Sequence, residues 1–231
     1  MGKRIIQQAR GKGSLTYRVR SKAYIYKVKY PAKIGEAEIL SILHSPAHSA
    51  PLMKLKIDNE IFYNCAFNGA YVGQKIQVSN LPQEGNIVPL KEIPSGTRIY
   101  NIEVNPGDGG KMMRASGTSA VVAKKLDYNK IAVLMPTRKE IVLSGDCKAT
   151  IGIVAGDGRT LKPFVKAGKK FYKMKARNKF WPRTSAVKFN AVDHPFGSGR
   201  GKRIKSKIAK RNAPPGAKVG HIRPRRTGRK K

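Results

Sequence analysis

Residues 53–66 read MKLKIDNEIFYNCA, and the pattern of apolar side chains in this stretch predicts β-structure. Apolar and polar residues alternate on both sides of Asp58-Asn59, a dipeptide that favours a turn. A period of two is typical of strands that bury one face. The stretch therefore predicts two short strands, Met53 to Ile57 and Ile61 to Ala66, connected by a turn.

The same alternation continues on both sides of this stretch. It predicts three more short strands, Tyr24 to Tyr30, Ala37 to Leu43 and Lys75 to Val78. Five short strands at this spacing favour a small barrel. A loop rich in Pro and Gly, Asn80 to Gly96, follows them and indicates a boundary near residue 85.

A second group of alternating runs follows this loop. Its members are Arg98 to Val104, Ser119 to Lys124, Ile131 to Met135, Glu140 to Leu143 and Ala149 to Val154. This group predicts a second barrel. The predicted fold class is therefore all-β, with two small barrels between long N- and C-terminal extensions.

The charge of the chain is far from balanced and is concentrated at its two ends. Lys and Arg number 48 against 13 acids, a net charge of +35. Residues 1–30 carry nine bases and no acid, residues 31–158 fourteen bases and twelve acids, and residues 159–231 twenty-five bases and one acid, Asp193. Such an excess goes beyond what solubility requires and implies a polyanionic partner. We expect the nearly neutral middle to fold and the ends to bind phosphates.

A membrane surface and a nucleic acid are the two polyanions that this charge could bind. Membrane binding requires an amphipathic basic helix with Trp or Phe on its apolar face. The terminal basic runs are instead interrupted by Gly and Pro, and Trp181 is the only tryptophan. The pattern therefore favours nucleic acid and predicts no membrane partner.

The sequence after Gly158 no longer has the period of strands. Residues 164–177 predict one short helix that Phe164, Phe171 and Met174 anchor, with its lysines facing outward. From Pro195 onward Gly, Pro, Lys and Arg dominate, a composition that cannot build a core. We expect this last segment to become ordered only on RNA.

The compartment is predicted from the apolar runs and the cysteines. No apolar run approaches the roughly 18 residues of a membrane span, and the first four residues lead into polar sequence without the apolar core of a signal peptide. We therefore expect an intracellular protein. Cys65 and Cys147 are the only cysteines, and in such a compartment we expect both to be reduced and buried.

The glycine-rich runs do not have the spacing of a nucleotide-binding loop. PGDGGK at residues 106–111 and GSGRGK at residues 197–202 both lack the G-x-x-x-x-G-K-[ST] pattern. Their glycines favour tight turns and a close approach of the backbone to RNA.

His44 and His48 have the spacing of metal ligands on a helix, but Pro46 lies between them. We expect neither a cofactor nor a metal.

Asp193-His194 and the tyrosines near residue 24 each allow two interpretations. A carboxylate that orients an imidazole is the arrangement of a general base, but no nucleophile is marked nearby, so we favour a positioned RNA contact. Tyr24, Tyr26 and Tyr30 lie on one face of a predicted strand. We favour a core position for them over base stacking.

Specific motifs are spread along nearly the whole chain. The most specific are NAVDHPFG at residues 190–197, NAPPG at 212–216, KVGH at 218–221 and RRTGR at 225–229, and further motifs occupy residues 2–14, 44–52, 106–118, 147–152 and 166–169. In this order they resemble large-subunit ribosomal protein two, the universal L-two family, and most closely its archaeal branch.

The resemblance implies a fold and a role. It implies a basic RNA-binding arm at residues 1–30, an oligonucleotide-binding-type barrel at 31–84, an SH-three-like translation-protein barrel at 85–176 and a basic extension at 177–231 that penetrates ribosomal RNA. Family members are primary binders of large-subunit ribosomal RNA near the peptidyl-transferase centre, and they support subunit association, transfer-RNA binding and peptide-bond formation. The chain would then be a structural constituent of the large ribosomal subunit in the cytoplasm. It would contact neighbouring ribosomal proteins and, across the subunit interface, small-subunit RNA. We expect the RNA to catalyse peptide-bond formation, so we do not expect this protein to be an enzyme.

The resemblance and the charge together select candidate site residues. Beside the peptidyl-transferase centre we expect RNA contacts from Asp193, His194, Gly197 and Gly199, with no catalytic residue. The wider contacts to ribosomal RNA are expected from His48 and the cationic side chains Lys3, Arg4, Arg10, Lys12, Lys111, Arg114, Lys169, Lys170, Lys175, Arg177, Arg183, Arg200, Lys202, Arg203, Lys210, Arg211, Lys218, Arg223, Arg225, Arg226 and Arg229.

The chain departs from the family pattern in three places. In the family's H-D-P-x-R-S-A loop, Ser45 replaces the Asp and His48 replaces the Arg. Before Asn190 the family pattern is R-G-V-A-M, whereas residues 185–189 read SAVKF, with Ser185 and Ala186 in place of the Arg and Gly. The third glycine position after Phe196 is also altered, and residues 198–200 read SGR.

Two other functions use the same features. An RNA-acting enzyme would use Asp193 and His194 as acid and base, and it would need a formed pocket. A chromatin-like DNA binder would also use cationic tails on phosphates. Co-sedimentation with large ribosomal subunits through high salt would fit only the ribosomal protein.

Overall fold

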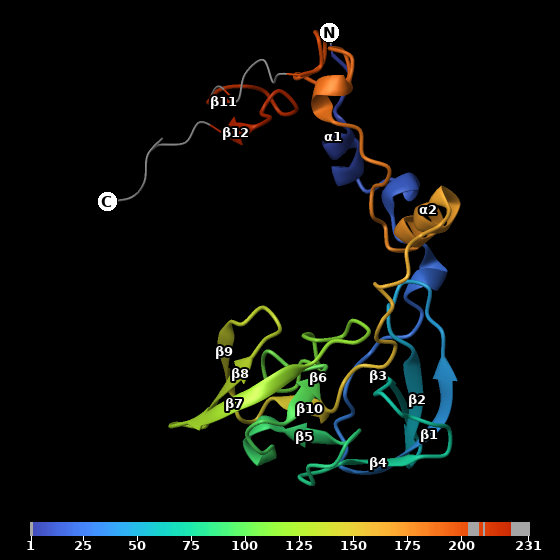
Figure 1. The fold of residues 1–231 in the computed structure, drawn as a ribbon, viewed down its shortest axis with the longest axis vertical. Coiled ribbons are helices and arrows are strands. Elements are labelled where there is room, and N and C mark those ends of the chain that lie inside the picture. The colour runs from blue at the N-terminus through green and yellow to red at the C-terminus, as the bar shows by residue number, and fades with distance from the viewer. Residues whose placement is uncertain (1, 203–207, 210, 223–231) are drawn as a thin grey trace. The chain divides into compact units, whose positions relative to one another are not determined.

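The computed structural model describes residues 2–202, 208–209 and 211–222, and it contains two compact units (Figure 1). We call Arg20–Arg177 the β unit. Met1–Val19 and Asn178–Lys231 together form the terminal unit. The two ends of the chain, which the charge pattern singles out, therefore belong to one unit.

The β unit is built on one sheet with the strand order β3-β2-β1-β4-β5-β10-β6-β7-β8-β9. The strands of its first half are β1 (Gly35–Leu43), β2 (Leu52–Ile57), β3 (Glu60–Cys65) and β4 (Lys75–Val78). Those of its second half are β5 (Ile87–Pro89), β6 (Arg98–Tyr100), β7 (Ala120–Leu126), β8 (Lys130–Leu134), β9 (Glu140–Ser144) and β10 (Lys148–Ile151). A single parallel pair, Val78 with Ile87, connects the two halves. This architecture confirms the predicted all-β class.

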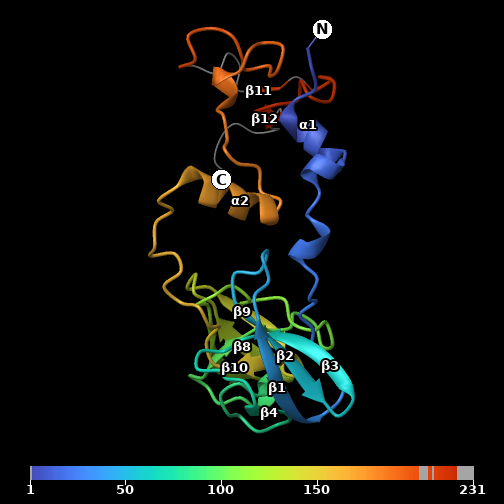
Figure 2. The same cartoon turned by 90° about the vertical axis from the view of Figure 1, so that its right-hand side faces the viewer.

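The hairpin predicted at residues 53–66 is present as β2 and β3, which lie side by side with β1 (Figure 2). Ile57 pairs with Glu60, so Asp58 and Asn59 form the turn. Asp58 has a φ of 49°, in the left-handed region that Asp and Asn tolerate better than most residues. The turn residues and the alternation of side chains thus both fit the observed register between β2 and β3.

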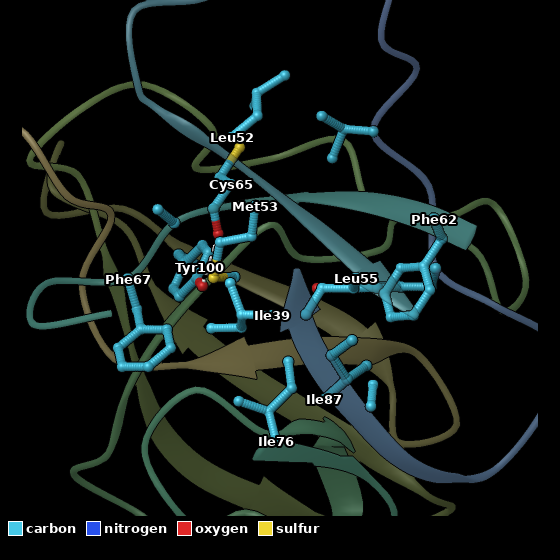
Figure 3. Close-up of a cluster of buried hydrophobic side chains, with 14 of the residues drawn as sticks. Ile39, Leu52, Met53, Leu55, Phe62, Cys65, Phe67, Ile76, Ile87 and Tyr100 are labelled. Carbon is cyan, nitrogen blue, oxygen red and sulfur yellow. Dashed lines mark hydrogen bonds between the residues drawn. The ribbon is translucent and has the colours of Figure 1, made fainter. Parts of the chain in front are cut away.

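Two separate hydrophobic cores lie inside the β unit. The first is built on β1 to β4 and contains Ile39, Leu52, Leu55 and Ile76, all 1% exposed or less (Figure 3). The second is built on β5 to β10 and contains Val88, Leu90, Ile99, Val122, Val133 and Cys147. Two cores are what two small barrels require. Cys65 and Cys147 are buried and unpaired, as predicted.

A buried polar network connects the two halves. The Tyr30 hydroxyl donates to the Asn101 carbonyl at 2.6 Å and lies 2.8 Å from the Thr150 hydroxyl. Asn64 donates to Thr150 at 3.0 Å and accepts from the Asn101 side chain at 2.9 Å. Buried polar groups are costly unless they are paired, so this network favours one arrangement of the two cores.

The strand predicted at Tyr24 to Tyr30 is wrong. The structure has a 3-10 helix at Ser21–Ala23 and then only an isolated bridge between Val28 and Tyr63. Val28 and Tyr30 enter the first core and Tyr26 packs against it, whereas Tyr24 is 47% exposed. The core position is therefore confirmed for Tyr30 and not for Tyr24.

The loop predicted at Asn80 to Gly96 contains regular structure. It holds β5 and a 3-10 helix, Leu90–Glu92, and it buries Ile87, Val88, Leu90 and Ile93. Strand β6 is shorter than predicted because Asn101, at a φ of 48°, leaves the extended conformation. These residues belong to the core of the unit and not to a linker.

One α-helix completes the β unit. Helix α2 (Ala167–Ala176) confirms the predicted helix, but Phe164 precedes it and none of its residues is buried. Phe171 is 39% exposed, so it does not anchor the helix in a core as expected. Among the described residues, no helix has both the length and the apolar character needed to cross a membrane.

The terminal unit has little regular structure. It contains helix α1 (Ile6–Gly11), 3-10 helices at Leu15–Tyr17 and Ala186–Lys188, and the short parallel pair of β11 (Ile208–Ala209) with β12 (His221–Ile222). Its buried hydrophobic residues, among those described, are Ile5 and Ala209. The backbone N–H of Lys3 donates to the carbonyl of Val192 at 2.7 Å, so the two ends of the chain contact each other.

Candidate nucleic-acid interface

The first candidate surface lies on the β unit around His48. Its ring nitrogen Nδ1 is 2.7 Å from the Ser45 hydroxyl, and Tyr24 packs edge-on against the ring at 5.0 Å between centroids. Burial lowers the pKa of His48, and the nearby charges of Arg114 and Arg177 lower it further. The ring is therefore neutral at pH 7 and can either donate or accept a hydrogen bond. Ser45 and His48, both of which depart from the family pattern, thus contact each other.

A cavity of about 450 Å³ opens beside His48. It is lined by Tyr24, Tyr26, Lys27, Val28, His48 and Arg114. Arg114 is half-buried, and its guanidinium donates to the Gly110 carbonyl at 3.3 Å. Aromatic side chains beside cations are the combination that binds unpaired bases and the phosphates between them.

The glycine-rich loop at residues 103–111 is held by two carboxylates. Buried Glu103 accepts the backbone N–H groups of Gly109 at 2.9 Å and Lys148 at 2.8 Å. Asp108 accepts the backbone N–H groups of Val104 and Asn105, both at 3.2 Å, and pairs with Lys111 at 3.3 Å. Glu103 thus connects this loop to β10 through Lys148, whereas the hydrogen bonds of Asp108 lie within the loop.

The pKa of Asp108 and the packing of Gly110 are consistent with a rigid loop. Burial acts to raise the pKa of Asp108, but hydrogen bonds from the Asn105 backbone and Lys111 outweigh burial and lower it. Gly110 has a φ of 85°, and a Cβ there would clash with Asn101. The loop therefore presents Lys111 from a fixed backbone.

Helix α2 forms a cationic surface on the same unit. Lys173 Nζ lies 4.8 Å from the centre of the Phe164 ring, and Lys175 Nζ lies 5.8 Å from that of Phe171. Burial lowers the pKa of Lys173, and the charges of Arg159 and Arg177 add to this. Within the described residues, the buried Nε of Arg177 has no hydrogen-bond partner. Such an unpaired donor among cations favours an anionic ligand.

The second candidate surface lies in the terminal unit, on the turn that carries His194. The Asn190 carbonyl accepts the backbone N–H groups of Asp193 and His194, and the Gly197 N–H donates to the His194 carbonyl at 2.8 Å. A Cβ at Gly197 would clash with the Asn190 carbonyl, so only glycine fits there. The His194 ring packs between Phe189, stacked at 6.2 Å, and Phe196 at 5.2 Å.

Asp193 does not orient His194 in the way that the general-base interpretation would require. The ring nitrogen Nδ1 of His194 accepts the backbone N–H of Phe196 at 3.0 Å, so the backbone two residues further along holds the imidazole. Burial lowers the pKa of His194. In the neutral ring the proton is therefore on Nε2, which remains available as a donor. A carboxylate–imidazole pair, the arrangement of a general base, is not formed.

Two cavities adjoin His194. One, of about 250 Å³, is lined by Ile5, Ile6, Gln7, Arg10, Phe180, Arg183, Thr184, Ala186, Phe189, Asp193 and His194. The other, of about 380 Å³, shares Ile5 and His194 and adds Lys3, Arg4 and residues 214–217 among others. The predicted contacts Lys3, Arg4, Arg10, Arg183, Asp193 and His194 are thus brought together around one turn.

The remaining predicted residues lie on several surfaces. Lys12, Arg200, Lys202, Arg211 and Lys218 are exposed in the terminal unit, and Gly199, with a φ of 93°, follows the His194 turn. Lys169, Lys170 and Lys175 lie on α2. Arg203, Lys210, Arg223, Arg225, Arg226 and Arg229 lie outside the described residues. In the part of the chain that the structure describes, His, Cys, Asp and Glu do not gather in groups that could hold a metal.

Comparison with known proteins identifies the family. Residues 83–216 match the family model described as Ribosomal Proteins L2, C-terminal domain. Large ribosomal subunit protein uL2 of Archaeoglobus fulgidus is 46% identical to this chain, with 99% of each chain covered. The chain belongs to the uL2 family. The uL2 proteins of Hyperthermus butylicus, 44% identical over the whole of both chains, and of Korarchaeum cryptofilum, 42% identical over 100% of this chain and 97% of its own, are also similar. These archaeal uL2 relatives confirm the predicted archaeal type.

Sequence reasoning missed several residues that line the cavities of this uL2 chain. Lys27 lines the cavity beside His48, and Phe180 and Phe189 line the cavity beside Asp193. Arg10 lies 5.7 Å from the centre of the Phe180 ring. The run KFWPR at residues 179–183 could have indicated them, because its aromatic residues lie between Lys179 and Arg183, a pattern typical of nucleic-acid binding.

Proposed function

We propose that this chain is a structural protein of the large ribosomal subunit and that it binds large-subunit ribosomal RNA. The distribution of charge is the observation that carries this proposal. The terminal unit contains 22 bases and one acid, and the β unit 26 bases and 12 acids. A cationic unit with little core is suited to follow phosphates, since each neutralised phosphate releases counterions.

We further propose that the His194 turn lies near the peptidyl-transferase centre and that RNA, not the protein, catalyses peptide-bond formation there. His194 would act as a positioned donor through Nε2. The lowered pKa and the absence of an oriented carboxylate support this role, because a general base works best with a pKa near the working pH. In this role the protein supports subunit association and transfer-RNA binding without taking part in the chemistry.

The same proposal assigns the surfaces of the chain. The arm at residues 1–30 and the extension at 177–231 would hold the RNA, and the bodies at 31–84 and 85–176 would present His48, Lys111 and Arg114 to it. Neighbouring ribosomal proteins and small-subunit RNA would contact the remaining surface in the cytoplasmic ribosome. The cationic cavities around His48 and His194 support the two principal contact regions.

Purification from cells tests this function directly. A tagged full-length chain should sediment with large subunits through high salt, because an interface buried within the subunit would retain it after salt has weakened the phosphate contacts. Recovery with DNA in place of ribosomal RNA would overturn the proposal. A chain that sediments alone at moderate salt would do the same.

A further inference from the structure

The smaller cavity beside His194 has the size and walls of a site for one flat ring. Its volume of about 250 Å³ lies just below the roughly 300 Å³ at which pockets for drug-sized ligands begin. Phe180 and Phe189 contribute aromatic side chains, and Ile5 and Ile6 contribute apolar ones. RNA-binding proteins take unstacked bases between surfaces of this kind.

Asp193 is the unusual member of this cavity. It is the only acidic residue among residues 159–231, which contain twenty-five Lys and Arg residues. Even so, none of the four salt bridges found among the described residues includes it. A carboxylate repels phosphates, so a general affinity for RNA does not account for an acid here. Its oxygens can accept hydrogen bonds from the N–H groups of a base.

Three other polar groups of the cavity are donors only, whereas Gln7 and Thr184 can both donate and accept. Arg10 and Arg183 carry guanidinium groups, and His194 offers Nε2–H because its Nδ1 accepts the Phe196 backbone N–H. The cavity therefore combines one group that only accepts with three that donate. This set distinguishes among the bases, because each base has a different order of donors and acceptors.

We propose that this cavity binds a single guanine base that is extruded from the ribosomal RNA. Guanine alone carries two neighbouring donors, N1–H and N2–H, which would face the two oxygens of Asp193. Its acceptors O6 and N7 would face the Arg and His donors. Adenine, cytosine and uracil each place only one donor beside an acceptor on that edge, so one carboxylate oxygen would face a lone pair. The inference rests on the proposed function, since the base must belong to an RNA.

The neighbouring cavity suits the backbone of the same nucleotide. It shares Ile5 and His194 with the first and is lined by Lys3 and Arg4. These two cations can neutralise the phosphates that flank an extruded base. The two cavities thus separate the two tasks, with phosphate binding at Lys3 and Arg4 and base selection at Asp193.

Short ribonucleotides provide the test. The full-length chain is titrated with labelled single strands UUGUU, UUAUU, UUCUU and UUUUU, and binding is followed by fluorescence anisotropy over a range of salt. We expect UUGUU to bind about tenfold more tightly than the others, within the range of one bidentate base contact. In Asp193→Asn, which keeps the shape but replaces one acceptor with a donor, this preference should disappear, and the affinity for UUUUU should not fall because a carboxylate that repels phosphates has been removed.

Asp127→Asn is the matched control. Asp127 is an exposed acid of the β unit, and its substitution changes the net charge by the same amount. The control should keep the preference for guanine. An Asp193→Asn chain that keeps the preference, or a wild-type chain that binds all four strands equally with steep salt dependence, would overturn the base site and leave the proposed function standing. A chain that binds none of the strands in a salt-dependent way would contradict the proposed function itself.

Discussion

The β unit and the terminal unit are specified by different physical forces. In the β unit the side chains alternate, two cores are buried, and acids hold the exposed loops by accepting backbone N–H groups. The terminal unit contains 22 basic residues and a single acidic one, and the only buried hydrophobic residues among those described in it are Ile5 and Ala209. The first unit is therefore stable through burial, whereas the second requires a partner that neutralises it.

Separating the two units should have the largest effect. Residues 20–177, expressed alone, should fold as a β-rich body, because both cores and the polar network are complete within them. Their affinity for ribosomal RNA should fall about a thousandfold, the usual gap between specific and non-specific binding. Circular dichroism and filter binding measure the two properties. A coil spectrum, or undiminished affinity, would remove the distinction between the units.

Removing core volume should destabilise the β unit strongly. Leu55→Ala empties a fully buried position between β1 and β3 and should cost about 2–5 kcal/mol of the free energy of unfolding. Leu161→Ala, at a position that is 84% exposed, is the control and should cost little. Urea unfolding of residues 20–177 provides the values. Similar losses in both variants would show that the proposed core does not determine stability.

Removing one hydroxyl should test the connection between the two cores. Tyr30→Phe leaves the buried Asn101 carbonyl without its hydrogen-bond donor and leaves the Thr150 hydroxyl with Asn64 as its partner, which should cost about 1–3 kcal/mol. Tyr128→Phe, at a tyrosine that is 93% exposed, should change nothing measurable.

The same pair of variants has a defined pH dependence. Burial is the main cause that raises the pKa of Tyr30 and of Tyr100 well above the ordinary value near 10. The unfolded chain therefore releases these protons first, so stability is complete below about pH 10 and falls as the pH rises further. Loss of stability above pH 10 should be shallower in Tyr30→Phe than in the wild type. Parallel curves would show that Tyr30 titrates as an exposed tyrosine.

The smallest effect is expected at His194. Gln keeps a side-chain donor but does not titrate near neutral pH, so His194→Gln should leave the chemical step of peptidyl transfer in reconstituted subunits nearly unchanged. Loss of a general acid–base group would instead slow that step by about 10²–10⁴-fold. A decrease of that size in fully assembled subunits would assign the chemistry to the protein.

The sequence predicted the parts of the fold in which local and long-range signals agree. Residues 53–66 combine alternation with a turn dipeptide, and the hairpin formed as expected. Residues 24–30 have the same alternation, yet they form only one bridge, to Tyr63, because alternation does not provide a pairing partner. Strand β5 was hidden because it has three residues and lies among Pro and Gly.

The candidate site was predicted in its composition and not in its geometry. The charge located the cations, but adjacency in sequence did not make Asp193 the partner of His194, since the backbone of Phe196 occupies Nδ1. The cavity beside Asp193 combines Arg10 with residues 180–194, and no local pattern connects segments so far apart in sequence.

The central claim, that the ends bind RNA while the middle folds, is tested most directly by the salt dependence of binding. The logarithm of the affinity for ribosomal RNA is measured against the logarithm of salt concentration for the full chain and for residues 20–177. Each phosphate contact contributes about 0.7–0.9 to the slope, so the full chain should show a much steeper slope than the β unit. Equal slopes for the two chains would place the phosphate contacts on the β unit and contradict the account.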